Sequence, residues 1–188
     1  MVKSSGRVRH FIAILPPIAI QQEATALKQH FAERYNSRAA LRSPPHITLV
    51  PPFEWRMVDR DRLIHALVAF ARDRAPFTVE ISGFGAFPPR VIYLNVLPTP
   101  ALMTIQRDLV ADVEKHLAIR DRHPGRPFRP HLTLAFRDLT PAAFRAAWPR
   151  FETQAQHATF TADALTLLAH SPAGWQIDET IKLQSFLT

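Results

Sequence analysis

The stretch PHITL at residues 45–49 returns as PHLTL at residues 130–134, 85 positions further along the chain. On a β-strand, side chains two residues apart point to the same face of the sheet. His46 and Thr48 therefore share one face, and His131 and Thr133 share the matching face of the second copy. The intervening apolar residues can anchor each strand in a core, which leaves both His-Thr pairs free to face a cleft.

The chain around each copy follows one order: strand, proline, long helix, loop, His-x-Thr strand, helix and strand. This order predicts one bilobal domain over residues 1–188, built from pseudo-repeats of about 8–88 and 90–187. Alternating apolar residues predict strands, and apolar residues at spacings of three and four predict helices. The predicted strands cover residues 8–15, 46–50, 76–87, 91–97, 131–136, 158–169 and 175–186, and the predicted helices cover 18–38, 58–73, 100–117 and 140–150.

Prolines and a threonine mark the ends of several predicted elements. Pro16–Pro17 and Pro51–Pro52 are expected to end the strands that precede them. Pro100 suits a first helical turn, and Thr140 followed by Pro141 is an N-cap with a favourable first position. The strands are too short and too polar on one face for a doubly wound parallel sheet. We therefore expect a duplicated, two-lobed α+β fold, in which two mostly antiparallel sheets face a central groove and the helices lie outside.

Length and composition restrict the class of protein. The 188 residues are 47% hydrophobic and 21% charged, as in ordinary globular domains. The absence of cysteine excludes a disulfide scaffold, a thiol nucleophile and a Cys-ligated metal site. With 17 prolines, only 5 glycines and neither a P-loop nor a GxGxxG pattern, a glycine-rich nucleotide-binding loop is disfavoured. No apolar stretch is long enough to span a bilayer and no signal peptide is recognisable, so we expect a cytoplasmic protein.

The charge balance bears on the class of partner. The chain carries 23 basic and 16 acidic residues, a formal net charge of +7, and only four of the basic residues are lysines. Arginine can bind a phosphate group through two parallel hydrogen bonds. The excess of arginine is consistent with a polyanionic partner, and equally with a coding preference for arginine and ordinary solubilising charge.

Two imidazoles and two hydroxyls in one cleft suit phosphodiester chemistry. One neutral histidine can take a proton from an attacking water or hydroxyl, while the other, protonated, gives a proton to the leaving oxygen. The threonine hydroxyls can donate to non-bridging phosphate oxygens. This chemistry needs no metal ion or other cofactor, because a pair of histidines supplies both acid and base near neutral pH.

A single His-x-Thr on a short strand is more often structural than catalytic, and the duplication could be a relic of the fold. A core, however, favours Val or Leu at such positions, and packing does not require His at both copies with Thr two residues later. The two motifs together therefore favour a catalytic interpretation that neither motif alone would support.

The duplicated motifs resemble the signature of the 2H phosphoesterase superfamily. Within it, nearly the whole chain is similar to the 2′-5′ RNA ligase-like proteins, also described as RNA 2′,3′-cyclic phosphodiesterases. The resemblance implies a bilobal fold in which both motifs line a central groove. It also implies His46 and His131 as the acid/base pair and Thr48 and Thr133 as phosphate-binding residues. One departure is VPPFE at residues 50–54, where better-known ligase-type members usually have a Phe-Leu-Gly run.

The motifs and the resemblance predict metal-independent hydrolysis of a cyclic phosphodiester, such as a 2′,3′-cyclic phosphate at an RNA end or on a nucleotide. One alternative is a binding module that holds a nucleotide or an RNA phosphate without turnover. Another is a ligase that joins RNA ends through a 2′-5′ bond, which reverses the direction with the same residues. We expect an RNA end or a small cyclic nucleotide as partner, no membrane contact and no obligate protein partner.

Several basic residues near the motifs are further candidates for substrate binding, with a solvated loop as the alternative for each. They are Arg42, before the first motif, and Arg126, Phe128 and Arg129, in the loop over residues 118–130 that enters the second and also contains Arg120, Arg122 and His123. Charge combined with an aromatic ring suits a single-stranded RNA end. Tyr93 is assigned to core packing, with groove lining as the alternative, and His170 is treated as a surface or packing residue.

Overall fold

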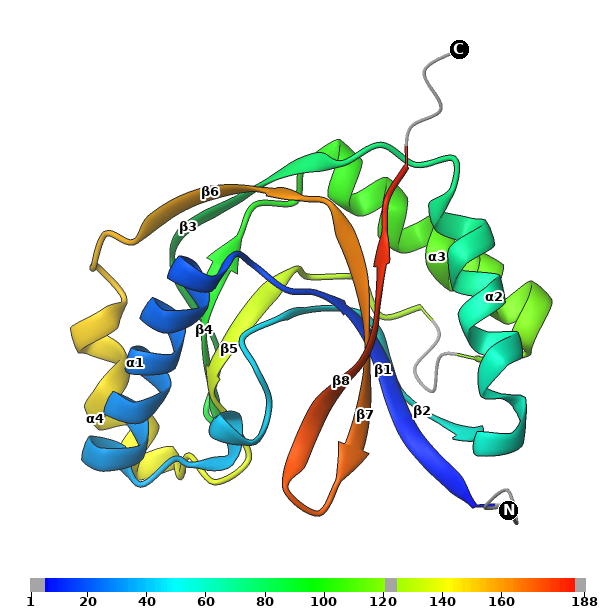
Figure 1. The fold of residues 1–188 in the computed structure, drawn as a ribbon. Coiled ribbons are helices and arrows are strands. Elements are labelled where there is room, and N and C mark those ends of the chain that lie inside the picture. Colours follow the sequence, from blue (N-terminus) through cyan, green and yellow to red (C-terminus); the bar gives the residue numbers. More distant parts are fainter. Residues whose placement is uncertain (1–5, 121–124, 185–188) are drawn as a thin grey trace.

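The computed structural model describes residues 6–120 and 125–184, and Figure 1 shows the course of the chain. The described residues form four α-helices, two short 3₁₀ helices and eight β-strands. In chain order these are β1 (Arg7–Ile14), α1 (Ile18–Tyr35), η1 (Ala39–Arg42), β2 (Ile47–Arg56), η2 (Met57–Asp59), α2 (Arg60–Ala71), β3 (Phe77–Phe87), β4 (Val91–Val96), α3 (Pro100–Leu117), β5 (His131–Ala135), α4 (Pro141–Phe151), β6 (His157–Ala162), β7 (Ala164–Ser171) and β8 (Gly174–Lys182).

All of these strands join one curled antiparallel sheet, in the order β6-β3-β4-β5-β2-β1-β7-β8. The α+β class and the antiparallel pairing are confirmed, but the prediction of two separate facing sheets is wrong. The reason lies at the two motif strands, where Ile47 on β2 pairs directly with Leu132 on β5. Both residues are fully buried in one large hydrophobic core, so the two halves of the sheet are continuous through the centre.

Two pairs of helices flank the sheet. α1 packs with α4 and against β5, while α3 packs with α2 and against β2. Figure 1 shows α1 and α4 on one side of the curled sheet and α2 and α3 on the other. α1, from the first half of the chain, therefore covers β5 from the second half, and α3, from the second half, covers β2 from the first. The two halves of the sequence are interleaved in space.

The starts of α3 and α4 lie where Pro100 and Thr140–Pro141 predicted them, and each has a threonine cap. Thr99 Oγ1 accepts a hydrogen bond from the Leu102 N–H at the start of α3, and Thr140 Oγ1 accepts one from the Ala143 N–H at the start of α4. A proline occupies the first turn of both helices, where its missing N–H leaves no hydrogen bond unmade. None of the helices in the described ranges combines the length and the apolar character that a membrane span requires.

β2 continues beyond Pro51 and Pro52, where the sequence predicted that the strand ends. In the pairing of β1 with β2, these two prolines lie opposite the single residue Phe11. This arrangement is a β-bulge, in which the extra residue makes no ladder hydrogen bond, so a proline is tolerated there. β2 therefore runs on to Arg56, and the prolines bend the strand without ending it.

The predicted strand over residues 158–169 is two strands that separate at Asp163. β6 pairs with β3 at one edge of the sheet, whereas β7 pairs with β1 in the other half. The Asp163 carbonyl accepts a hydrogen bond from the Leu183 N–H, and its carboxylate pairs with Lys182 at 2.6 Å, which holds the corner. Apolar residues continue on both sides of this corner, so periodicity alone does not reveal it. The final strand, β8, ends at Lys182, and residues 185 and 186 of its predicted range lie outside the described residues.

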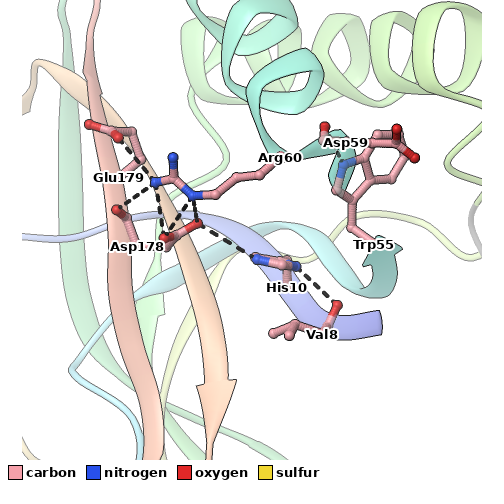
Figure 2. A network of polar contacts seen from close by, with 7 residues as sticks. All are labelled: Val8, His10, Trp55, Asp59, Arg60, Asp178 and Glu179. Atoms are coloured by element: carbon pink, nitrogen blue, oxygen red, sulfur yellow. Dashed lines mark hydrogen bonds and ion pairs between the residues drawn. The ribbon is translucent and has the colours of Figure 1, made fainter. Parts of the chain in front are cut away.

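A polar network ties α2 to β8, and His10 of β1 lies beside it (Figure 2). Arg60, the first residue of α2, donates to the Asp178 carboxylate on β8 from Nε and Nη2, and Nη2 also lies 3.3 Å from Glu179. His10 on β1 is fully buried, with Nδ1 bonded to the Val8 carbonyl and Nε2 3.7 Å from Asp178. Burial lowers the pKa of His10, so this ring is neutral at pH 7.

Candidate active site

The two His-x-Thr motifs lie side by side at the centre of the sheet, because β2 and β5 are antiparallel neighbours. The apolar residues of both motifs are buried, whereas His46, Thr48, His131 and Thr133 remain partly exposed on the opposite face. The alternation expected of a strand therefore holds in both copies. His46 and His131 lie close enough for the charge of one ring to disfavour protonation of the other.

Both imidazoles are held by the same kind of hydrogen bond. Nδ1 of His46 lies 2.7 Å from the carbonyl oxygen of Pro44, and Nδ1 of His131 lies 2.6 Å from that of Arg129. A carbonyl oxygen only accepts, so Nδ1 carries the proton and donates in each ring. In the neutral form Nε2 is then the basic nitrogen. The bond fixes both the tautomer and the orientation of each ring.

Both histidines are easier to deprotonate than histidine in water. Burial, opposed by the hydrogen bond to Pro44, lowers the pKa of His46 to about 4, and the charges of Lys28 and His131 act in the same direction as burial. Burial also lowers the pKa of His131, although the hydrogen bond to the Arg129 carbonyl acts to raise it. Both rings are therefore neutral at pH 7 when the groove holds no ligand. A bound anion favours the protonated form and raises both pKa values.

A cavity of about 300 Å³ opens over the first motif and reaches across to the second. Its lining combines three of the four motif side chains with arginines and aromatic rings, and His131 is not among the lining residues. These residues are Arg9, Phe11, Ala39, Ala40, Arg42, Ser43, His46, Thr48, Pro52, Thr133, Phe136, Arg137, His170 and Trp175. None of these lining residues is acidic. Within residues 6–120 and 125–184, no group of three His, Asp or Glu side chains is placed to hold a metal ion. The cavity thus presents positive charge and hydroxyl donors, which suits an anionic ligand.

Aromatic rings surround both imidazoles. The Phe11 ring lies 4.7 Å from the His46 ring and 4.6 Å from the indole of Trp175, centroid to centroid. The guanidinium of Arg9 lies 5.7 Å from the centre of the same indole, a cation–π contact. On the other side, the Tyr93 ring lies 5.0 Å from His131. Tyr93 is thus partly exposed beside the second motif, where the sequence predicted core packing.

Of the further predicted residues, only Arg42 lines the cavity, and its Nη2 donates to the Pro172 carbonyl at 3.1 Å. Arg126 and Arg129 are exposed outside the cavity lining, and Phe128 is partly buried and packs against the core. Arg129 lies near enough to Tyr93 for its charge to act on the phenol, although burial keeps the pKa of Tyr93 raised. The predicted Arg122 and His123 lie outside the described residues.

Sequence reasoning missed several residues of the cavity. Arg9 comes from β1, Arg137 follows β5, and Trp175 and His170 come from β8 and β7. The sequence did hold a signal for Arg9, because Arg9 and Phe11 are two residues apart on a predicted strand and so share a face. Nothing in the sequence around Trp175 or His170 points to the motifs, which they approach only through pairing of β7 with β1.

Known proteins resemble this chain along most of its length. A candidate phosphoesterase of Geobacillus kaustophilus is 31% identical over 176 residues, which cover 92% of this chain and 95% of the relative. A candidate phosphoesterase of Bacillus mycoides is 30% identical over 175 residues, with the same two shares covered. Both alignments are long enough to include the first and second halves of the chain.

Solved structures share the fold at lower sequence identity. A protein of Thermus thermophilus superposes with a TM-score of 0.72 at 22% identity, covering 95% of this chain and 99% of its own. Escherichia coli LigT in its apo form superposes with a TM-score of 0.67 at 21% identity, covering 96% of this chain and 100% of its own. The family model described as the 2′-5′ RNA ligase superfamily matches residues 16–173, a span that includes both His-x-Thr motifs. The interleaved fold, the paired motifs and this match place the chain in the 2′-5′ RNA ligase superfamily of 2H phosphoesterases.

Proposed function

We propose that the protein hydrolyses a cyclic phosphodiester, such as the 2′,3′-cyclic phosphate at an RNA end or on a nucleotide, with His46 and His131 as acid and base. One observation carries the proposal: on adjacent strands, each imidazole is bonded through Nδ1 to the carbonyl two residues earlier. Because the same nitrogen is occupied in both rings, each Nε2 is left to exchange a proton with a substrate.

In the proposed reaction, a water oxygen attacks phosphorus while one neutral imidazole takes a proton from that water at Nε2. The new P–O bond forms as the bond from phosphorus to the 2′ or 3′ oxygen breaks. The second imidazole, protonated at Nε2, gives its proton to the leaving oxygen. The products are a phosphomonoester and a free hydroxyl, and the two rings have exchanged protonation states. Proton exchange with water restores the starting state.

Thr48 and Thr133 are proposed to hold the non-bridging phosphate oxygens through their hydroxyls. Each shares a strand face with its histidine, and both line the cavity. A donor aimed at oxygens that gain charge as the ring opens stabilises the transition state more than the bound substrate. The threonines therefore complete a site with two proton-transfer groups and two phosphate donors.

The cavity lining supports a nucleotide or an RNA end as the ligand. Arg9, Arg42 and Arg137 supply positive charge without an acidic neighbour in the lining, and the partly exposed Trp175 offers a ring to a base. Structures of Escherichia coli LigT are known with 3′-AMP, with NADP⁺ and with ATP. We extend nucleotide binding from that protein to this chain as part of the proposal.

Product analysis tests the proposal. The protein is incubated, with and without EDTA, with an RNA that ends in a 2′,3′-cyclic phosphate and separately with a nucleoside 2′,3′-cyclic phosphate. Mass spectrometry is expected to show the gain of one water, equally with EDTA, and ³¹P NMR identifies the phosphomonoester isomer. Lys115→Met, far from the motifs, is the active control variant.

Two other outcomes would each replace the proposal. Binding of both ligands without product would indicate a module that holds phosphate without turnover. Joined RNA formed from added 5′-hydroxyl RNA, without hydrolysis under any condition, would indicate that ligation is the activity of the same residues.

A further inference from the structure

A buried lysine stands behind the first motif, outside the proposed reaction. Lys28 lies on α1 and is only 2% exposed, in a chain whose other described lysines lie on the surface. Burial lowers the pKa of Lys28 to about 8. Taking an ammonium out of water is costly, and an apolar side chain of similar length would fill the same space without that cost. A buried lysine is therefore retained for something other than packing.

The ammonium of Lys28 reaches the segment that carries the first motif. Nζ donates to the Ser43 carbonyl at 3.0 Å, and the next carbonyl, that of Pro44, accepts from Nδ1 of His46. Pro44 and Pro45 have no N–H, so this segment cannot anchor itself through its own backbone donors. Lys28 supplies an external donor to the carbonyl of Ser43, directly before the two prolines.

The β7–β8 turn closes on the same segment from the other side. Arg42 Nη2 donates to the Pro172 carbonyl, and a Cβ on Gly174 would lie 2.4 Å from the Arg42 carbonyl oxygen. Only glycine permits this approach, and the φ of +123° at Gly174 also requires it. The backbone before His46 is thus fixed between the β7–β8 turn and the ammonium of Lys28.

We propose that Lys28 is a positioning residue for His46: its ammonium fixes the Ser43 carbonyl, next to the Pro44 carbonyl that orients the ring, and its charge adds to burial in keeping that ring neutral and ready to accept a proton. The kinetic part of this proposal rests on the proposed function, and the structural part does not. Among the described residues, no lysine stands behind the second motif, where Nδ1 of His131 bonds to the exposed Arg129. The other cationic or titratable groups around His46 are Arg9, Arg42, Arg137, His131 and His170.

Titration of the protein by NMR tests the proposal without substrate. With histidine labelled at ¹³Cε1 and the resonance assigned through His46→Gln, the His46 signal of the wild type should report two ionisations. One is its own, in the acid range, and the other is that of Lys28, near pH 8. In Lys28→Arg the charge no longer titrates, so the step near pH 8 should vanish while the acid step remains. A wild-type His46 signal that is flat through pH 8 would overturn the proposal.

Replacement of the ammonium tests the same link in a second way. In Lys28→Met the pKa of His46 should rise, and kcat for the cyclic phosphate should fall about 10- to 100-fold, with KM changed less. Lys28→Arg should recover most of that kcat, since it keeps the donor and the charge. Lys115→Met removes an exposed lysine and should change neither quantity. A folded Lys28→Met with an unchanged His46 pKa and unchanged kcat contradicts the proposal.

The two measurements separate the possible failures. If Lys28→Met does not fold, the wild-type and Lys28→Arg titrations still decide the question. If the wild type turns over no cyclic phosphate but its His46 signal shows the step near pH 8, the proposed function fails and the role of Lys28 toward His46 stands.

Discussion

The first and second motifs have matching strands but different surroundings. In both, Nδ1 of the histidine bonds to the carbonyl two residues earlier, and a ring packs beside the imidazole. The carbonyl of the first motif belongs to a proline segment held by the buried Lys28. That of the second belongs to the exposed Arg129. The two motifs therefore match in their strands and in the aromatic ring beside each histidine. They differ in what holds the carbonyl to which each histidine is bonded.

The surroundings also act on the proton affinities of the two rings. Burial lowers the pKa of both histidines, but a neighbouring lysine acts in the same direction only on His46. An acid/base pair requires one group that holds its proton and one that has lost it. A duplicated motif supplies two identical groups, so the difference has to come from outside the motif.

The largest expected effect comes from removing either of the two motif histidines. His46→Ala and His131→Ala should each lower kcat about 10²- to 10⁴-fold on a 2′,3′-cyclic phosphate, since each deletes one proton-transfer group. The double variant should be little worse than either single variant, because both rings act in one step. Steady-state kinetics on all three proteins, with circular dichroism to check the fold, measures this. Near-wild-type turnover in either single variant contradicts the paired mechanism.

The threonines test whether the two motifs bind phosphate equally. Thr48→Val and Thr133→Val keep the shape and remove the hydroxyl donor, so kcat should fall about 10- to 150-fold at each site. Thr→Ser keeps the donor and should retain most activity. If the threonines serve only the strand, the result reverses: Val is tolerated and Ser is the worse replacement. Kinetics of the four variants on one substrate separates the two results.

The pH dependence sharpens the comparison between the two imidazoles. The reactive form has one ring protonated and one neutral. As pH increases, kcat/KM should first rise near pH 4, where His46 loses its proton. It should then fall as His131 loses its proton, at a pH lower than the usual pKa of histidine. At higher pH, the fraction of enzyme with this ring protonated should fall about tenfold per pH unit. The profile of kcat should lie at higher pH than that of kcat/KM, because bound phosphate raises both pKa values. A monotonic rise of rate with pH would remove the acid role.

The smallest effect concerns a contact between the two regions. Asp138, after the second motif strand, accepts hydrogen bonds from the Ser37 hydroxyl and from the N–H groups of Arg38 and Ala39, at the start of η1. It acts as a helix N-cap supplied by the other half of the chain. Asp138→Ala should lower the free energy of unfolding by about 0.5–2 kcal/mol, measured by urea denaturation. Asp138→Asn should lose less, since its side-chain oxygen still accepts.

Local rules predicted much of this fold, and failed where distant strands decide. The helix starts at Pro100 and at Thr140–Pro141 were predicted from residues within the first turn. The bulge at Pro51 depends on Phe11, which lies on a strand that the chain leaves before α1. The corner at Asp163 depends on Leu183 and Lys182, which come two strands later. In each case the deciding partner is remote in sequence.

The same limit applies to the candidate site. Period two places each histidine and its threonine on one face, and the structure agrees for both motifs. Lys28 could not be found in this way, because a single lysine on a helix normally faces solvent. Trp175 and Arg9 meet at the groove only because β7 pairs with β1 and β8 with β7. The placement of the motif side chains was predictable from the sequence, whereas the residues that surround them were not.

The join between β2 and β5 has a mechanical consequence. The neighbouring pairs β1–β2 and β3–β4 are in register over most of their length, but only Ile47 and Leu132 register across the centre. Among the described strands, we therefore expect the sheet to flex more easily along the line between β2 and β5 than within either half. The two imidazoles stand on opposite sides of that line. If the sheet flexes along this line, the separation of the two imidazoles is the dimension that changes first, and under the proposed function this would let one site accept phosphate esters of different bulk.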